Sequence, residues 1–289
     1  MGALRICIDQ GVLARGSALM GVLNLTPDSF YDGGVYASDE QARTQIDRLL
    51  VEHADLIDIG GESSRPQAKP VPAEEQIARI EPAVRYALSR GAVVSIDTTS
   101  PLVAERMLGL GAHAVNDISC LADPELAGVC ARHGASLILM HARGAMQNMP
   151  GFSRYPDDAY ADVVGEVLGE WRVARDRAIS RGLSKDQVLL DPGIGFAKNA
   201  RHSFELLRGL ERFSKEGVPV VVGASRKSFI SAVDDAPPSE RLGGSIAAAL
   251  LAVDRGASVL RVHDVRAVHQ ALMVARGIRR GISAEALGA

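Results

Sequence analysis

The stretch Arg90-Gly91-Ala92-Val93-Val94-Ser95-Ile96-Asp97 carries the pattern that decides the fold of this chain. A helical pattern ends at a glycine, a short apolar run follows at once, and the run stops at a polar residue. Glycine adopts the left-handed backbone conformation that closes a helix, so the next strand begins without a long connection. The apolar run does not alternate with polar residues, which is typical of a strand buried on both faces of a parallel sheet.

The same pattern returns along the chain, closely at residues 110–117, 134–141 and 256–263, and more loosely at residues 182–191 and 217–223. Together with the apolar runs at residues 18–24 and 56–60, it predicts eight strands. Helical patterns lie between the strands, at residues 39–52, 74–89, 101–110, 124–133, 158–181, 201–215, 239–255 and 265–279. Eight strand–helix units in order indicate a (β/α)8 TIM barrel of the α/β class. The alternative is a doubly wound open sheet, which rarely needs eight such regular units.

The length of the chain fits one barrel. Its 289 residues are close to the roughly 250 residues that such a barrel commonly uses as a single domain. We expect residues 18–289 to form the barrel domain. Residues 1–17 are expected to form a short N-terminal hairpin or cover segment over the barrel floor.

The composition argues against several classes of function. The 32 Lys and Arg against 35 Asp and Glu give a net charge of −3, without the basic excess that nucleic-acid binding needs. Three scattered cysteines are too few for a disulfide framework or a C-x-x-C metal site. No apolar run approaches the roughly 18 residues of a membrane span, and the N-terminus lacks the apolar core of a signal peptide. We therefore expect a cytoplasmic protein with neither nucleic-acid nor membrane partners.

Polar residues stand at the carboxyl ends of all the predicted strands, which meet at one mouth of a barrel. They are Asn24, Asp58, Asp97, Asn116, His141, Asp191, the loop Ser225-Arg226-Lys227-Ser228, and Arg261 with His263. Asp97 and Asp191 offer hydrogen-bond acceptors, and Asn116 offers an amide, to a planar heterocycle that is rich in N–H groups. Donors for an anion come from Arg65, Lys227, Arg261 and His263. The sequence therefore predicts one ligand with both characters, while Asp58 and His141 either serve that ligand or only orient loops.

Two other kinds of site are not supported by the sequence. The seven histidines form neither an H-E-x-x-H nor an H-x-H pattern, which argues against a zinc site. The run Gly193-Ile194-Gly195 resembles half of a dinucleotide-binding fingerprint, but the third glycine and the immediate helix are missing.

Four loop segments carry the most specific signals, and each follows a predicted strand. They are Asn24-Leu25-Thr26-Pro27-Asp28-Ser29-Phe30, Gly60-Gly61-Glu62-Ser63-Ser64-Arg65-Pro66, Asp191-Pro192-Gly193-Ile194-Gly195-Phe196 and Ser225-Arg226-Lys227. Their proline and glycine content marks loops that need special backbone angles. In order and spacing these segments resemble the dihydropteroate synthase family, and the resemblance spans residues 19–265.

The resemblance implies a pterin-binding barrel, usually a homodimer, that acts as a transferase in folate biosynthesis. Its members condense 6-hydroxymethyl-7,8-dihydropterin diphosphate with p-aminobenzoate and release pyrophosphate. The resemblance also implies Mg²⁺ as the cofactor and sulfonamides as inhibitors.

The family's site residues can be carried over one by one. Those that bind the pterin ring match Asp97, Asn116 and Asp191, with Lys227 beside the ring. The Mg²⁺ ligand matches Asn24. The groups around the diphosphate match Ser64, Arg65, Arg261 and His263.

Two loops resemble those that close over the p-aminobenzoate site of the family. Asp28 and Phe30 lie on the first loop, and Arg65 and Pro66 lie on the second. Contacts to the p-aminobenzoate ring and carboxylate match Phe196 and Ser228 respectively. Catalytic roles are thereby expected for Asp28, Arg65, Lys227, Arg261 and His263.

The sequence departs from the family's pattern at three positions. Ser64 stands where Thr is more common, Gln67 where Gly is usual, and Ala197 where Gly often follows the Phe. These departures bear on the p-aminobenzoate pocket more than on the pterin site, so sulfonamide affinity is expected to differ from that of other members.

Two other functions were weighed against the synthase. A pterin-dependent methyltransferase has a similar barrel but needs neither the segment at residues 24–30 nor Ser225-Arg226-Lys227. A non-catalytic pterin-binding homologue should have lost Lys227, Asn24 or the Arg261-Val262-His263 run, and this chain has all of them.

Overall fold

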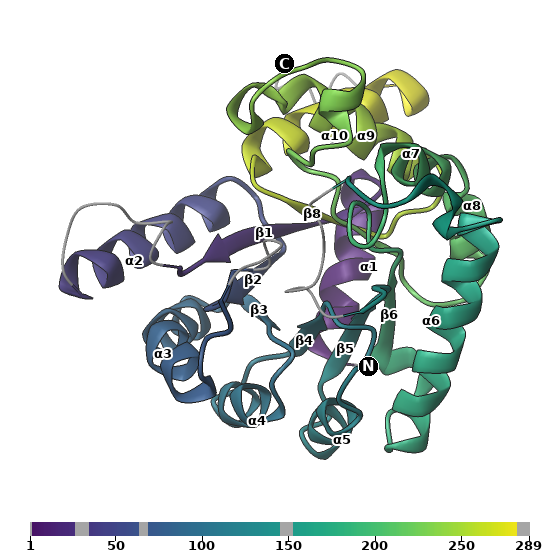
Figure 1. The fold of residues 1–289 in the computed structure, drawn as a ribbon. Helices are drawn as coiled ribbons and strands as arrows, with labels where there is room; N and C mark the ends of the chain where they lie inside the picture. The colour runs from purple at the N-terminus through teal and green to yellow at the C-terminus, as the bar shows by residue number, and fades with distance from the viewer. Residues whose placement is uncertain (1, 27–34, 64–68, 145–152, 282–289) are drawn as a thin grey trace, which may run out of the picture.

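The computed structural model describes residues 2–26, 35–63, 69–144 and 153–281. Its strands are all parallel and lie in one sheet in the order β6-β5-β4-β3-β2-β1-β8-β7 (Figure 1). They are β1 (Ala18–Asn24), β2 (Leu56–Gly60), β3 (Val93–Asp97), β4 (Ala114–Asp117), β5 (Ser136–Met140), β6 (Val188–Asp191), β7 (Val221–Val222) and β8 (Val259–Val262). A single bridge between Leu190 and Val220 joins β6 to β7 and closes the ring. The predicted TIM barrel is confirmed.

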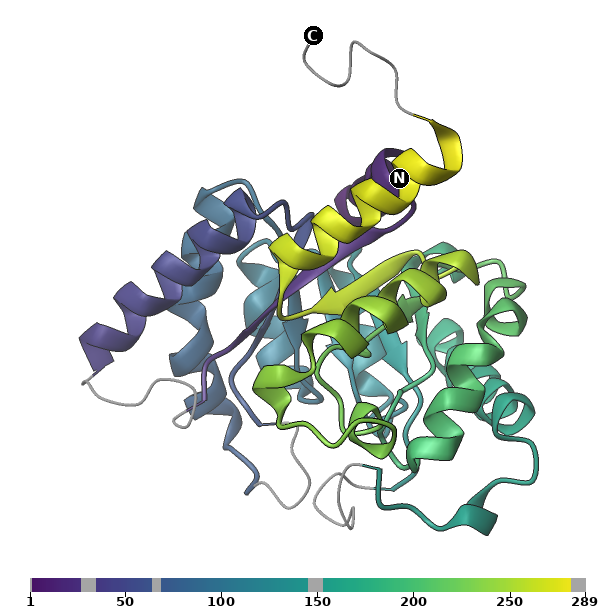
Figure 2. The same cartoon turned by 90° about the horizontal axis from the view of Figure 1, so that it is seen from above.

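Helices surround the barrel in the alternation that the sequence predicts (Figures 1 and 2). They are α2 (Val35–Val51), α3 (Ala73–Ser89), α4 (Pro101–Gly109), α5 (Glu125–Arg132), α6 (Val163–Ser180), α7 (Ala200–Arg208), α8 (Leu210–Ser214), α9 (Leu242–Asp254) and α10 (Val265–Arg280). Within the described ranges, no helix combines the length and the apolar character that crossing a membrane requires.

Most of the predicted helices agree with the structure to within four residues at each end, and two differ for reasons that the structure shows. The helix expected at residues 158–181 begins at Val163, because the side chain of Asp162 accepts the hydrogen bond of the Gly165 amide at 3.0 Å and caps the helix there. The helix expected at residues 201–215 is split into α7 and α8 at Gly209. A side chain at Gly209 would lie 2.8 Å from Val164, so this position accepts only glycine without a shift of its neighbour.

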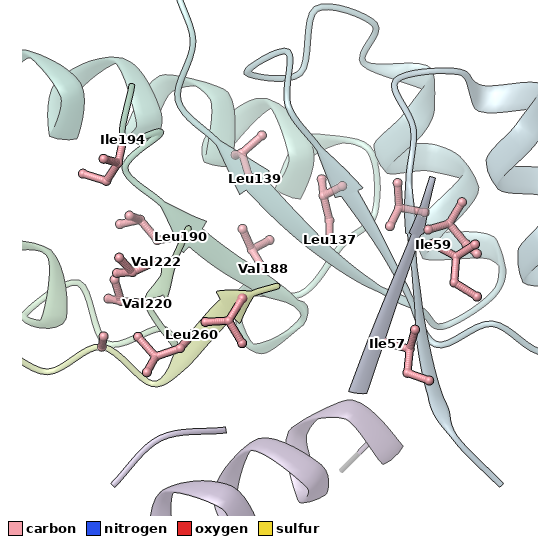
Figure 3. Close-up of a cluster of buried hydrophobic side chains, with 14 of the residues drawn as sticks. Ile57, Ile59, Leu137, Leu139, Val188, Leu190, Ile194, Val220, Val222 and Leu260 are labelled. Carbon is pink, nitrogen blue, oxygen red and sulfur yellow. The ribbon is translucent and has the colours of Figure 1, made fainter. Parts of the chain in front are cut away.

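Successive residues of each strand face opposite sides of the barrel wall, and this alternation forms two apolar cores. The outer core lies between the strands and the helices and contains Ile57, Ile59, Leu137, Leu139, Val188, Leu190, Val220, Val222 and Leu260 (Figure 3). The inner core fills the barrel near the amino ends of the strands and contains Met20, Leu56, Ala114, Ile138, Leu189, Val221 and Val259. The inner core makes the barrel a packed body with a floor, so that its other end is left to carry the site.

The N-terminal segment is a helix, α1 (Ala3–Arg15), so of the two forms expected there, a hairpin or a cover segment, the hairpin is wrong. Leu4, Cys7 and Ile8 share one face of this helix and pack into the inner core. The buried Arg15 forms an ion pair with Asp55, which follows α2. Helix α1 therefore closes the barrel floor, and Figure 2 shows it lying beside α10.

We predict that Gly11→Ala destabilises the protein by about 1–3 kcal/mol. A Cβ at Gly11 would lie 2.6 Å from the Cα of Ala18, so α1 would have to move away from β1. The matched control is Gly169→Ala in the interior of α6, where no atom lies within 4 Å of the added Cβ. That substitution should stabilise by about 0.5–1 kcal/mol, because alanine favours the helix. Urea unfolding measures both, and equal effects of the two substitutions would contradict the close packing of α1.

Candidate active site

The inward-facing positions nearest the carboxyl ends of the strands are largely polar. They continue the rows of the inner core, two residues further along each strand, with Asp58 after Leu56, Asn116 after Ala114, Asp191 after Leu189 and Arg261 after Val259. The period of two therefore places apolar side chains on the floor and polar side chains at the mouth. Asp97 stands one step further along β3, beyond Ser95.

Arg261 joins the polar groups of three strands. Its Nε donates to Oδ2 of Asp58 at 2.7 Å, and its Nη2 donates to Oδ2 of Asp97 at 2.8 Å. The amide of Asn116 donates to the same Oδ2 of Asp58 at 3.0 Å. The structure thus brings together three of the predicted site residues, Asp97, Asn116 and Arg261, although Arg261 lies 164 positions from Asp97 in the sequence.

Asp58 is the residue that holds this group together, and the sequence left its role open. Its side chain is 0% exposed, and its Oδ1 has no hydrogen-bond partner among the described residues. A buried carboxylate requires a counter-charge, which Arg261 supplies. One feature of the sequence does indicate a role for Asp58. It is a charged residue inside the apolar run Leu56-Ile57-Asp58-Ile59, and the strand period of two places it on the same side as the core residue Leu56.

Asp191, Phe196 and Lys227 form a second group at the mouth. Asp191 is 5% exposed, and its Oδ1 accepts the amide hydrogen of Gly193 at 2.7 Å. The Nζ of Lys227 donates to the carbonyl of Ile194 and lies 4.4 Å from the centre of the Phe196 ring. Burial lowers the pKa of Lys227 to about 7, although the carboxylate of Asp191 opposes this change. Lys227 therefore lies against the segment that follows Asp191.

The loop that carries Lys227 is held in place by Arg226. Arg226 has a φ of +57°, a left-handed conformation that is unfavourable for a side chain with a Cβ. Its backbone amide donates to Ser245 at 2.8 Å, and its guanidinium pairs with Asp264, just after β8. In the sequence, Arg226 is one member of the Ser225-Arg226-Lys227 motif with no role of its own. In the structure it anchors the loop and so places Lys227.

His263 and Ser228 lie beside this loop. The His263 backbone amide donates to the Ser225 hydroxyl at 3.3 Å, and Nδ1 of His263 lies 3.1 Å from the same oxygen. His263 is exposed to solvent at the mouth, so its ring is accessible to a ligand. The Ser228 hydroxyl lies 2.8 Å from that of Ser153.

Asn24 ends β1 next to Gly60 of β2, at the same end of the barrel. Within the described part of the chain, no group of three or more His, Cys, Asp or Glu side chains could hold a metal. Mg²⁺ prefers oxygen ligands and commonly keeps waters while binding substrate phosphates. One amide oxygen at this position fits Mg²⁺ as a partner shared with a diphosphate, and does not amount to a metal site of its own.

Five predicted site residues lie outside the described residues: Asp28, Phe30, Ser64, Arg65 and Pro66. The same holds for Gln67, one of the departures from the family pattern. Ala197, another departure, is buried and has a φ of +48°. A glycine would adopt this backbone conformation without steric strain, which gives a physical reason for glycine at this position in related sequences.

Burial raises the pKa of Asp97 to about 7, and the positive charge of Arg261 opposes this rise. Asp58 contributes to the rise through its own negative charge. Two carboxylates that share one guanidinium cannot both be ionised without cost. Asp97 is therefore a carboxyl that gains or loses its proton close to neutral pH.

This pKa predicts a pH dependence of stability. The folded protein keeps a proton on Asp97 up to about pH 7, whereas an unperturbed carboxyl releases it near 3.8. Between these values folding takes up a proton, so the free energy of unfolding falls as pH rises, by at most about 1.4 kcal/mol per pH unit from this group. Burial lowers the pKa values of His141 and His263 to about 4, and these two groups give the opposite slope between about pH 4 and 6.5, so the test is the difference between variants. Between about pH 5 and about pH 6.5, urea titrations should show the free energy of unfolding of wild type and of the exposed control Asp235→Asn falling relative to that of Asp97→Asn, by at most about 1.4 kcal/mol per pH unit. The same pH dependence in Asp97→Asn as in wild type would refute the assignment.

Comparison with known proteins adds a family to this geometry. The model of the family described as pterin binding enzyme matches residues 20–263. The dihydropteroate synthase of Haemophilus influenzae is 37% identical over 269 residues, which cover 93% of this chain and 94% of that protein.

Solved structures agree with the sequence relatives. A dihydropteroate synthase of Xanthomonas albilineans with 4-aminobenzoic acid superposes with a TM-score of 0.82 at 38% identity, covering 91% of this chain and 93% of that one. The Yersinia pestis dihydropteroate synthase, in complex with a sulfonamide drug, superposes with a TM-score of 0.84 at 37% identity, covering 92% and 95%. These matches span nearly the whole barrel, and the chain belongs to the dihydropteroate synthase family of pterin-binding enzymes.

Proposed function

We propose that this chain condenses 6-hydroxymethyl-7,8-dihydropterin diphosphate with p-aminobenzoate to give 7,8-dihydropteroate and pyrophosphate, a step of folate biosynthesis. The observation that carries the proposal is the convergence of Asp97, Asn116, Asp191, Lys227 and Arg261 on one mouth of the barrel. At this mouth, hydrogen-bond acceptors that suit a flat ring rich in N–H groups lie beside cationic side chains that suit an anionic tail. Membership of the dihydropteroate synthase family supports the same reaction.

The pterin ring is bound by the inward-facing carboxyl and amide groups. Asp97 and Asp191 accept hydrogen bonds from the ring's N–H groups, Asn116 completes the set, and Lys227 donates from the side. The Nη2 of Arg261 already donates to Asp97 in the ligand-free site. When an N–H group of the ring donates to this carboxylate oxygen, it replaces the hydrogen bond from Nη2 of Arg261. That nitrogen can then donate to the diphosphate.

Loss of the diphosphate starts the reaction. The bond between the pterin methylene carbon and the bridging oxygen breaks, and its electron pair leaves with the pyrophosphate. Arg261 and His263 bind that leaving group, with Ser64 and Arg65 assigned to it by the family resemblance. Asn24 would share Mg²⁺ with the diphosphate oxygens, where the ion would neutralise negative charge on the leaving group.

The aromatic amine then attacks the methylene cation that remains. The nitrogen lone pair forms the new C–N bond, and the nitrogen gives up a proton to solvent, so no strong base is needed. Phe196 packs on the aryl ring and Ser228 binds its carboxylate, while Phe30 and Pro66 belong to the loops assigned to the same pocket. Asp28 is assigned a place near the cation, where a carboxylate would stabilise positive charge.

Three further properties complete the proposal. A sulfonamide drug binds the Yersinia pestis relative, and we infer that this chain binds the same class, with the affinity altered by Gln67 and Ala197. We also infer a cytoplasmic location, which the free state of Cys7, Cys120 and Cys130 supports. A second copy of the chain is the partner that we propose for the face formed by α9 and α10.

The wild-type chain is expected to release pyrophosphate and form dihydropteroate when both substrates are mixed with Mg²⁺. Chelation of Mg²⁺ should slow both products together. A pterin-dependent methyltransferase would form neither product from these substrates, so their absence would overturn the proposed reaction.

Asp97→Asn should weaken binding of the pterin diphosphate by roughly 10-fold or more, because an ionisable acceptor for the ring is replaced by an amide. Arg261→Ala should mainly lower the rate of pyrophosphate release. Direct binding and single-turnover measurements separate the two effects, and thermal melting checks that both variants are folded. Unchanged turnover in both would contradict the site assignment.

The dimer proposal rests on apolar side chains that are exposed on α9 and α10, two helices that lie side by side in Figure 1. Leu251 of α9 is 53% exposed, and Val274 and Ile278 of α10 are 55% and 80% exposed. Wild type should have about twice its monomer mass of 30.6 kDa in light scattering. The double variant Val274→Asp, Ile278→Asp should be monomeric, whereas Val51→Asp on α2, at a valine that is 75% exposed, should remain dimeric. A monomeric wild type would rule the dimer out.

A further inference from the structure

A buried polar cluster lies behind the loop that follows β6, and the proposed reaction does not use it. Lys198 and His141 are both 0% exposed, and the Nζ of Lys198 lies 3.0 Å from Nδ1 of His141. The same ammonium donates to the carbonyl of Phe196 at 2.8 Å and to that of His141 at 3.5 Å. A lysine without exposure is unfavourable unless its donors are paired, so its presence in this position needs a physical reason.

The cluster continues from His141 to α6. Nε2 of His141 lies 2.9 Å from Oε2 of Glu170, and Arg143 donates its Nε to the same carboxylate at 3.0 Å. The hydrogen bond from His141 and the one from Arg143 lower the pKa of Glu170 to about 2, so this carboxylate only accepts. His141 therefore carries its proton on Nε2, and its Nδ1 accepts from Lys198.

The loop in front of this cluster has an unfavourable backbone conformation. Gly193 has a φ of +69°, and a Cβ there would collide with the carbonyl oxygen of His141. Ala197 also has a positive φ, and its carbonyl accepts from the Tyr160 hydroxyl at 3.0 Å. A residue with a Cβ in this region costs about 1–2 kcal/mol. The loop keeps its conformation only because neighbouring groups hold it.

The two ends of this loop carry two groups of the proposed site. Asp191 stands at the start, where its carbonyl accepts from the His141 amide at 2.9 Å. Phe196 stands near the end, where its carbonyl accepts from Lys198. His141 and Lys198 thus hold opposite ends of the loop and are bonded to each other.

We propose that Lys198 is a positioning residue: its ammonium ties the Phe196 end of the loop to His141 of strand β5, and so aims Asp191 at the pterin ring and the Phe196 ring at the aryl amine. The inference rests on the roles proposed above for Asp191 and Phe196. The partners of the ammonium are groups of the protein, so Lys198 acts through the loop and not on the reacting atoms.

The charge of Lys198 supports the same role. Burial raises the pKa of Asp191, and the positive charges of Lys227, Arg261 and Lys198 oppose that rise. Burial lowers the pKa of Lys198 itself to about 7, and the charge of Asp191 opposes this change. In its protonated form Lys198 therefore also favours the ionised form of Asp191, which accepts hydrogen bonds from the ring most strongly.

The first test is Lys198→Met, which keeps a long apolar side chain and removes the donors. Equilibrium binding of the pterin diphosphate should weaken at least 10-fold, and the KM for p-aminobenzoate should rise at least 10-fold. The control is Trp171→Phe, which removes a buried hydrogen bond from α6 to the Leu139 carbonyl of the same strand β5. That control should lower the melting temperature and leave binding and KM unchanged. A Lys198→Met protein that melts earlier but binds and turns over with wild-type KM would overturn the proposal.

A second pair of variants decides the same question if Lys198→Met does not fold. His141→Asn keeps an acceptor for Lys198, whereas His141→Leu removes it. The proposal expects the KM for p-aminobenzoate to rise at least 10-fold in the leucine variant and to stay within about 3-fold of wild type in the asparagine variant. Equal KM values in the two variants would refute it.

Asp191→Asn in the same series separates the positioning role from the site assignment. Unchanged pterin binding in Asp191→Asn would overturn the assignment of Asp191 itself. Weakened binding there, together with wild-type binding in Lys198→Met, would overturn only the role of Lys198.

Discussion

One guanidinium shared by two buried carboxyl groups is the interaction on which the rest of the site depends. Asp58 and Asp97 come from adjacent strands, with side chains 0% and 10% exposed, and Arg261 reaches both from β8. Carboxylates placed this close repel each other and are costly to desolvate. A planar guanidinium has donors on two edges, so the single side chain of Arg261 can hydrogen-bond both carboxyl groups. The compact ammonium of a lysine is less suited to bonding two carboxyl groups in fixed directions.

This arrangement follows from strand register and from one glycine. Gly60 is paired with Asp97 in the sheet, and a Cβ at Gly60 would lie 3.1 Å from the Cβ of Asp97. The glycine therefore leaves room for the carboxyl at the mouth. The placement of the other polar side chains follows from the alternation of inward and outward positions along each strand. The inward-facing residues are apolar at the floor of the barrel and polar at its mouth.

The sequence predicted the barrel because its signal is local and repeated. Most strands lie between a helix-closing glycine and a polar end, which can be recognised within about eight residues; before β2 the left-handed position belongs to His53, with a φ of +74°. The α1 helix was missed although Leu4, Cys7 and Ile8 have helical spacing, because a short segment before the first strand has no repeat to compare with. The partners of Asp58 and Lys198 could not be predicted from spacing, since Arg261 lies 203 positions from Asp58 and His141 lies 57 positions from Lys198. Only the folded barrel brings these residues together.

Arg261 is already paired within the mouth, and under the proposed function this has a consequence for binding. Arg261 is engaged by Asp58 and Asp97, so a diphosphate that arrives without a ring must compete with two carboxyl groups for one cation. A ring that hydrogen-bonds to Asp97 removes one competitor and leaves Asp58 to hold the guanidinium by its Nε. With the roles proposed for Asp97 and Arg261, recognition of the ring and of the anion would be coupled through a single side chain, which would favour a ligand that carries both characters over two separate ones.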